Sequence, residues 1–269
     1  MEDQLPIELS NVAKIKISQL TKRFQSARGQ PVDALGPIEF EIEAGEFVAV
    51  VGPSGCGKST LLNVMAGFDK ATSGRIEIDG RTIGSPGPER GVVFQDYALF
   101  PWLTVEGNIG FGPQSLKLPA TEVSERVRHW IEAVRLQGSE QKYPHELSGG
   151  MRQRCALARC LANDPAVLLM DEPLAALDAL TRVQLQEDLL EVWNEASRDS
   201  PKSALYITHA IDEALYLADR VVVMSERPGR VLKIIQVPFA RPRDPEMRTS
   251  ADFHRLSDEI WRLLRPAGH

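Results

Sequence analysis

Residues 47–60, FVAVVGPSGCGKST, decide the fold of this chain. The first five are all apolar, and a short continuous apolar run is typical of a strand buried on both faces of a sheet. The next eight fit the pattern G-x-x-x-x-G-K-[ST], and a helix is expected to open near Lys58. A strand, a glycine-rich loop and a helix in this order predict a phosphate-binding loop.

The predicted loop contains each kind of group that a polyphosphate and its metal ion require. Glycines let backbone N–H groups turn inward around the anion, and the following helix presents further unpaired N–H groups. Lys58 adds a mobile positive charge, and Ser59 offers a hydroxyl to Mg²⁺. A nucleoside triphosphate with Mg²⁺ is the expected ligand. Its predicted contacts are Gly52, Pro53, Ser54, Gly55, Cys56, Gly57, Lys58, Ser59 and Thr60.

Composition narrows the class of protein. The chain has 269 residues, of which 43% are hydrophobic and 25% charged, as in ordinary globular proteins. Its net charge of −6 argues against an overall basic surface for nucleic acid. The three cysteines match no metal or disulfide pattern and are expected to be reduced and buried. The first ten residues do not read as a secretory signal, and no apolar run approaches the length of a membrane span.

Hydrophobic periodicity changes along the chain. Residues 12–18, 38–43 and 75–79 alternate apolar and polar, which is typical of half-buried strands, and residues 26–31 have the composition of a loop. Residues 96–163 are predicted to be a mostly helical insert, with one helix over 151–162. Another helix of the insert is expected from apolar residues at helical spacing, with Thr121 as its N-cap. These apolar residues are Val123, Val127, Trp130 and Val134.

Strands return after the insert. Residues 166–170, 204–208 and 220–224 are short apolar runs, and helical patterns over 179–197 and 210–218 separate them. Strands that alternate with helices predict a parallel sheet covered on both faces. A last amphipathic helix is expected from the spacing of Phe253, Leu256, Ile260 and Leu263.

An acidic pair ends the strand in VLLMDEP, residues 167–173. The carboxyl ends of parallel strands are where α/β sheets hold ligands, and successive strand residues point to opposite sides. Asp171 is expected to reach Mg²⁺ through water, Glu172 to polarise an attacking water, and Pro173 to end the strand. The alternative is a structural role, because caps and turns also use acidic residues.

The segment LSGG, residues 147–150, lies between the phosphate loop and VLLMDEP, and it resembles the signature motif of ABC-transporter ATPases. The other motifs of that family follow in order. Gln95 resembles the Q-loop glutamine, Asp178 belongs to a segment similar to the D-loop, and His209 resembles the switch histidine. Phe24 resembles the aromatic residue that stacks on adenine; the alternative is a core residue.

The resemblance implies a fold class and a domain organisation. It implies an α/β P-loop NTPase core with an N-terminal antiparallel β subdomain and a helical insert that carries the signature motif. The expected nucleotide-binding domain covers residues 12–240, with the insert at about 96–163. Residues 241–269 are then an extension with one amphipathic helix.

The resemblance also implies a shared active site. Two copies pack head-to-tail, and Ser148, Gly149 and Gly150 of one copy cover the ATP that the other copy holds in its phosphate loop. Glu172 is the implied water-polarising base, His209 contacts the γ-phosphate, and Asp178 links the two sites. Gln95 touches Mg²⁺, together with Ser59 and Asp171.

The same resemblance implies a role in transport. FPWLTV at 100–105 and residues 219–230 resemble the bacterial nitrate, sulfonate and taurine import ATPases. This implies a separate permease, an indirectly associated solute-binding protein, and a place on the cytoplasmic face of the inner membrane. Phe100, Trp102 and Leu103 are candidates for the permease groove; packing inside the insert is the alternative. Two other readings stay open, a soluble ABC ATPase and a non-hydrolysing scaffold.

Overall fold

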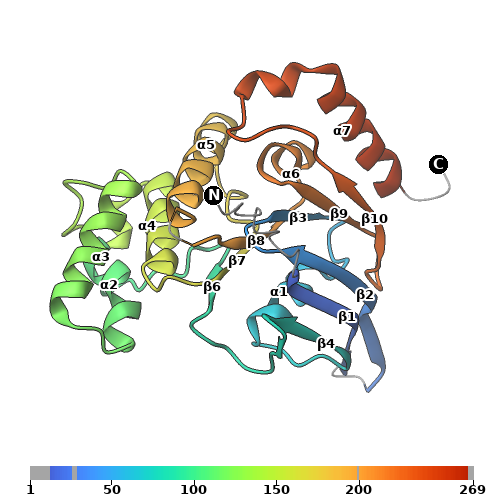
Figure 1. Cartoon of the computed structure of the whole chain (residues 1–269), viewed down its shortest axis with the longest axis horizontal. Coiled ribbons are helices and arrows are strands. Elements are labelled where there is room, and N and C mark those ends of the chain that lie inside the picture. Colours follow the sequence, from blue (N-terminus) through green and yellow to red (C-terminus); the bar gives the residue numbers. More distant parts are fainter. Residues whose placement is uncertain (1–12, 26–28, 199, 266–269) are drawn as a thin grey trace, which may run out of the picture.

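The computed structural model describes residues 13–25, 29–198 and 200–265 (Figure 1). Six strands form one sheet in the order β10-β9-β3-β8-β7-β6, and four form a second in the order β2-β1-β4-β5. Strands β3, β6, β7, β8 and β9 run parallel to one another, and β10 is antiparallel to β9. The strands of this sheet are β3 (Phe47–Val51), β6 (Arg90–Val93), β7 (Val167–Asp171), β8 (Ser203–Thr208), β9 (Arg220–Met224) and β10 (Val231–Gln236).

Strand β3 is fully buried, as the apolar run predicts. Phe47, Ala49 and Val51 belong to one hydrophobic core, and Val48 and Val50 belong to the core on the other face. The second core also contains residues of helix α1 (Lys58–Ala66) and of the four-stranded sheet. This alternation places the end of β3, where the phosphate loop begins, between two packed layers.

The four-stranded sheet is antiparallel where the sequence predicts alternating strands. It contains β1 (Ala13–Gln25), β2 (Pro31–Glu43), β4 (Ser73–Ile78) and β5 (Arg81–Thr82). Strands β1 and β2 are longer than expected because their pairing continues through several register shifts, which interrupt the apolar alternation. Val12 and residues 26–28 lie outside the described residues.

The predicted helical insert contains α2 (Val105–Ser115), α3 (Ala120–Ala133), the short 3₁₀ helix η1 (Pro144–Glu146) and α4 (Gly149–Leu161). Helices α2, α3 and α4 contact one another and lie together on the left of Figure 1. Two expectations were wrong. Pro119, not Thr121, is the N-cap of α3, and it makes no side-chain cap. Helix α4 begins at Gly149, two residues earlier than expected, because Ser148 caps it.

The remaining helices cover the parallel sheet. They are α5 (Ala179–Ala196), α6 (Ile211–Leu217), the 3₁₀ helix η2 (Pro245–Thr249) and α7 (Ala251–Leu264). Helix α7 packs against α6 and β9, and it buries Phe253, Leu256 and Ile260 as its periodicity predicts. No helix within the described residues is both long enough and apolar enough to cross a membrane.

Candidate functional site

Residues 52–57 form the loop between β3 and α1. Gly55 and Gly57 have φ values of +77° and +106°, a left-handed conformation that glycine adopts without steric cost. A Cβ atom at Gly57 would lie 2.7 Å from a side-chain carbon of Leu35 and 2.8 Å from the Ala34 carbonyl oxygen. The side chain of Cys56 is buried, so the loop offers backbone at this position. Both conformation and packing therefore require a glycine immediately before α1.

Lys58 is held over the loop from its first position in α1. Its Nζ donates to the carbonyl oxygens of Gly52 at 2.8 Å and Pro53 at 3.1 Å, and the residue is 6% exposed. Backbone carbonyls are neutral acceptors, whereas a phosphate oxygen is charged and forms the stronger bond. The arrangement therefore fits a triphosphate in the loop.

Ser59 and Asp171 come together from α1 and the carboxyl end of β7. Ser59 Oγ donates to Asp171 Oδ1 over 3.1 Å. Burial raises the pKa of Asp171, and the hydrogen bond from Ser59 opposes that shift. A hydroxyl and a carboxylate beside a phosphate loop are oxygen donors of the kind that Mg²⁺ prefers. The two residues therefore fit the predicted metal role.

Glu172 and His209 meet beside this pair. Glu172 Oε2 and His209 Nδ1 are 2.9 Å apart. Strand β7 ends at Asp171, so the expectation that Pro173 ends the strand was wrong. Glu172 has φ +43°, and its N–H donates to Ile207 O at 3.0 Å. The side chains of Glu172 and Asp171 therefore point in different directions because the backbone of Glu172 is left-handed, and not because side chains alternate along a strand.

Gln95 and Phe24 lie on different sheets, Gln95 after β6 of the six-stranded sheet and Phe24 on β1 of the four-stranded sheet. Gln95 is exposed in the turn that directly follows β6. Phe24 lies near the end of β1, is 36% exposed, and has Lys22 Nζ 4.6 Å from its ring centroid. The exposed ring is therefore available to a planar ligand, although no ring stacks on it among the described residues.

A second group of predicted residues lies in a groove of about 590 Å³ between the starts of α4 and α5. Ser148 Oγ accepts from Met151 N at 3.3 Å, and Asp178 Oδ1 accepts from Thr181 N at 3.0 Å. Hydrogen bonds from Thr181 lower the pKa of Asp178. Gly149 and Gly150 also line the groove, whereas none of residues 52–60 does. The two groups of predicted nucleotide contacts therefore lie at separate places on one chain.

The groove contains polar residues that the sequence analysis missed, namely Arg152, Arg154, Thr181 and Gln184. Arg152 lies on α4 two residues after Gly150, and its guanidinium carbon is 5.9 Å from the Tyr97 ring centroid. The sequence feature that could have identified Arg152 was a basic residue soon after the two glycines that start the helix. Thr181 and Gln184 gave none, because their place in the groove depends on how α5 packs beside α4.

Aromatic side chains gather where a permease groove is expected. Phe100 lies 5.6 Å from Trp102 and 4.4 Å from Phe111, measured between ring centroids. Trp102 is 70% exposed and Phe111 is 44% exposed, whereas Phe100 and Leu103 are half-buried. We call Phe100, Trp102 and Phe111 the aromatic surface. Phe111 was not predicted, because it comes from α2 and joins the surface only through packing.

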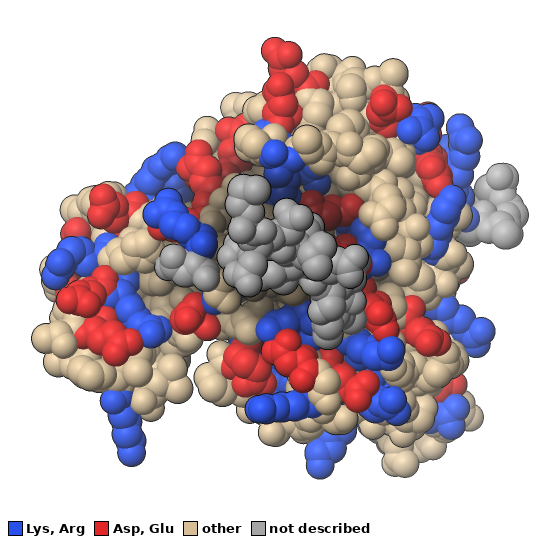
Figure 2. Space-filling view, in the orientation of Figure 1, with Lys and Arg blue, Asp and Glu red and all other residues tan. Residues whose placement is uncertain are grey.

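The distribution of charged side chains and the state of the cysteines agree with what the composition predicts. Figure 2 shows basic and acidic side chains interspersed over the face that it draws, without a broad region of one sign. The three cysteines are free and buried, as expected. Burial raises the pKa of Cys155 and of Cys160 to about 12.

Comparison with known proteins links this geometry to a family. A sequence profile of ABC transporters matches residues 35–175. The chain is 47% identical over 252 residues to the uncharacterized ABC transporter ATP-binding protein MJ0412 of Methanocaldococcus jannaschii, covering 94% of this chain and 91% of that protein. It is 45% identical to the aliphatic sulfonates import ATP-binding protein SsuB of Bacillus thuringiensis, covering 94% and 97%. It is 48% identical to the taurine import ATP-binding protein TauB of Roseobacter denitrificans, covering 84% and 83%.

Solved structures resemble the whole architecture. The dimeric ATP-binding cassette MJ0796, in a post-hydrolysis state bound to ADP and Pi, superposes with a TM-score of 0.71 at 30% identity. That match covers 84% of this chain and all of the cassette. The protein CbiO1 of Clostridium perfringens gives a TM-score of 0.72 at 29% identity, covering 93% of this chain and 97% of that one.

Proposed function

This chain belongs to the ABC transporter family of ATPases, and from that premise we propose that it powers the import of a small anion. The relatives named for aliphatic sulfonates and for taurine support this solute class. Nitrate and related small anions belong to the same class of solute. The ATPase acts from the cytoplasmic face of the inner membrane, through a separate permease and, indirectly, a solute-binding protein.

The observation that carries the proposal of a shared site is the separation of two groups of predicted nucleotide contacts on one chain. The phosphate loop has Lys58, whereas the groove at Ser148 offers a helix start with Arg152 and Arg154, and no lysine, among its lining residues. Two copies packed head-to-tail would bring the groove of one against the loop of the other, which closes as a two-fold dimer. The dimeric cassette MJ0796 supports that assembly.

We assign roles to the site residues on this basis. Residues 52–60 bind the phosphates of ATP, and Phe24 contacts adenine. Ser59, Asp171 and Gln95 would hold the Mg²⁺ that accompanies ATP, and that ion would offset the charge of the phosphates. Glu172 accepts the proton of the attacking water, and His209 holds the terminal phosphate. Ser148, Gly149, Gly150 and Asp178 act on the nucleotide of the partner copy.

The same proposal covers the domain boundaries and the permease. Residues 12–240 form the nucleotide-binding domain, residues 96–163 its insert, and residues 241–269 an extension. The aromatic surface, with Leu103 beside it, receives an apolar segment of the permease. Exposed aromatic side chains that lie together are the type of residue that dominates protein interfaces.

The docking role has a direct test with a matched control. Trp102→Ala should weaken binding to the reconstituted permease about tenfold or more, because it removes an exposed tryptophan anchor. Trp261→Ala removes another exposed tryptophan, 54% accessible on α7, and should leave permease binding unchanged. Equal effects of the two variants would contradict the docking role of Trp102.

The transport function is tested by reconstitution. The chain is expected to co-purify with a permease and, in vesicles with that permease and its binding protein, to hydrolyse ATP faster when taurine, an alkanesulfonate or nitrate is added. The solute that stimulates hydrolysis identifies the substrate. An active ATPase that binds no permease would instead support the soluble ABC ATPase.

A further inference from the structure

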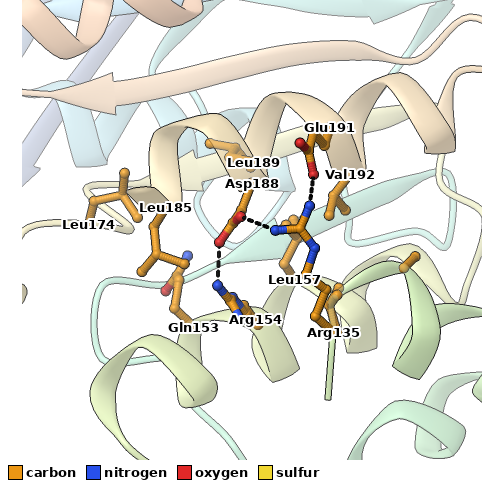
Figure 3. Close-up of a pocket in the computed structure, with 12 residues that line it drawn as sticks. Arg135, Gln153, Arg154, Leu157, Leu174, Leu185, Asp188, Leu189, Glu191 and Val192 are labelled. Carbon is orange, nitrogen blue, oxygen red and sulfur yellow. Dashed lines mark hydrogen bonds and ion pairs between the residues drawn. The ribbon is translucent and has the colours of Figure 1, made fainter. Parts of the chain in front are cut away.

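A cluster of charged side chains joins the helical insert to α5. Asp188 on α5 accepts from Arg154 of α4, over 2.5 Å, and from Arg135, which follows α3, over 3.2 Å. Arg135 also contacts Glu191 of α5 over 2.5 Å. Figure 3 shows both arginines directed toward α5, with Asp188 between them. Asp188 Oδ1 additionally accepts from Gln184 at 3.4 Å.

Burial separates this cluster into an inner pair and an outer pair. The side chains of Asp188 and Arg154 are 9% and 24% exposed, whereas those of Arg135 and Glu191 are 55% and 61% exposed. Exposed pairs contribute little, but a buried carboxylate that loses its partner is strongly unfavourable. The inner pair therefore resists separation far more than the outer pair.

The surroundings of the inner pair leave little freedom. Apolar side chains of α4 and α5, with Leu174 before α5, line a cavity of only about 20 Å³ beside it, which is about the space of one water molecule. Those apolar residues are Leu157, Leu174, Leu185, Leu189 and Val192. Within the described chain, Arg154 Nε has no hydrogen-bond partner, so Asp188 is the group that fixes the Arg154 guanidinium.

The inner pair lies on the two helices whose first residues form the groove. Ser148 is the N-cap of α4, which carries Arg154, and Asp178 is the N-cap of α5, which carries Asp188. At about 1.5 Å per residue, the pair lies roughly 9 Å along α4 and 15 Å along α5 from these caps. Because the ion pair joins α4 to α5 at this distance from their first residues, it controls the angle between the two helices. That angle sets the width of the groove.

We propose that Asp188 is a positioning residue: through Arg154 it holds α4 against α5 so that Ser148 and Asp178 together receive the nucleotide of the partner copy. Asp188 itself touches no nucleotide. The inference rests on the proposed shared site. It assigns the alignment of that site to an ion pair in which Arg154 lines the groove and Asp188 lies outside its lining.

The test is Asp188→Asn, made both in the otherwise unchanged chain and in a Glu172→Gln background. ATP affinity of the single subunit should stay within about twofold, because the phosphate loop is untouched. ATP-dependent dimerisation of the Glu172→Gln protein should weaken about tenfold or more, as removal of one member of a buried charged pair predicts. In the otherwise unchanged chain kcat should fall by a similar factor, with little change in KM.

Glu191→Gln is the matched control, because it removes only the exposed partner of Arg135. It should leave dimerisation and kcat within about twofold. Asp188→Glu keeps the charge and should restore most of the dimerisation that Asp188→Asn loses. If Asp188→Asn does not fold, Arg154→Lys takes its place, since lysine keeps the charge without the guanidinium geometry.

The outcomes separate the two proposals. Normal ATP-dependent dimerisation and normal kcat in Asp188→Asn, or in Arg154→Lys if that variant replaces it, would overturn the role of Asp188 alone. If the variant lost ATP binding by the single subunit to the same extent as dimerisation, the role of Asp188 would also be overturned. The substitution would then disturb the whole subunit and not the groove alone. A Glu172→Gln protein that stays monomeric with ATP would overturn the shared site itself.

Discussion

Glu172 and His209 are in direct contact, with Oε2 and Nδ1 2.9 Å apart. They come from the ends of β7 and β8, which are neighbouring parallel strands. A carboxylate only accepts, so Nδ1 of His209 donates and its Nε2 remains for another partner. The left-handed backbone of Glu172, φ +43°, is consistent with a position that function requires, because most side chains avoid this conformation.

Glu172→Gln tests the catalytic assignment. Glutamine keeps the size and a carbonyl oxygen for His209 but cannot accept a proton from water. We expect ATP hydrolysis to fall by about 10²–10⁴, with ATP still bound. Phosphate release measures the rate, and light scattering with ATP and Mg²⁺ should show a dimer. A monomer under those conditions would count against the shared site.

Ser148→Arg tests which copy the groove serves. The large side chain should fill the groove and exclude the partner, while the phosphate loop of the same chain remains free. The isolated subunit should therefore bind ATP within about twofold of normal, but hydrolysis should fall about a hundredfold or more. Calorimetry and phosphate release measure the two quantities.

Ser124→Arg is the control for that variant, since Ser124 is exposed on α3 and does not line the groove. It should change neither ATP binding nor hydrolysis. Weaker ATP binding by the isolated Ser148→Arg subunit would place the groove in the same site as the phosphate loop, against the assignment to the partner.

Gly229→Ala tests a support of the phosphate loop. Gly229 lies in the turn between β9 and β10, and its N–H donates to Ala34 O at 3.1 Å. A Cβ there would lie 2.1 Å from Cys56 O of the loop. The loop must shift, so we expect ATP affinity to fall about tenfold or more. Gly84→Ala, where a Cβ meets open space, should leave it unchanged. Normal affinity in Gly229→Ala would show that the turn does not brace the loop.

The buried thiols predict how stability changes at alkaline pH. Burial raises the pKa of Cys155 and Cys160 from 9.0 to about 12, so the unfolded chain releases these protons first as the pH rises. Stability should therefore be unaffected by these thiols below pH 9 and should fall between pH 9 and about 12. Each thiol contributes about 1.4 kcal/mol per pH unit in that window.

The double variant Cys155→Ala, Cys160→Ala isolates this contribution. Urea unfolding at a series of pH values should show a shallower alkaline decline than the unchanged chain, after both are referred to their stability at pH 8. Parallel curves for the two proteins would mean that the thiols are not buried as described.

The sequence predicted those features that are local in the chain. The phosphate loop, the helix α5 and the acidic residues at the end of β7 are contiguous segments, so spacing and residue type suffice to place them. The weaker signals failed for a physical reason. Strand β10 was not predicted, because half-buried residues on a sheet edge give little pattern, and Thr121 was a plausible cap that α3 does not use.

The sequence by itself thus determined the chemistry of the nucleotide site and the family of the fold, because each motif needs only its own neighbours along the chain. Tertiary structure alone decided which motifs face one another. The contact of Glu172 with His209, the joining of Phe111 to Phe100 and the pairing of Arg154 with Asp188 all connect distant segments. Such contacts depend on how whole helices and strands pack, and no short stretch of sequence carries that information.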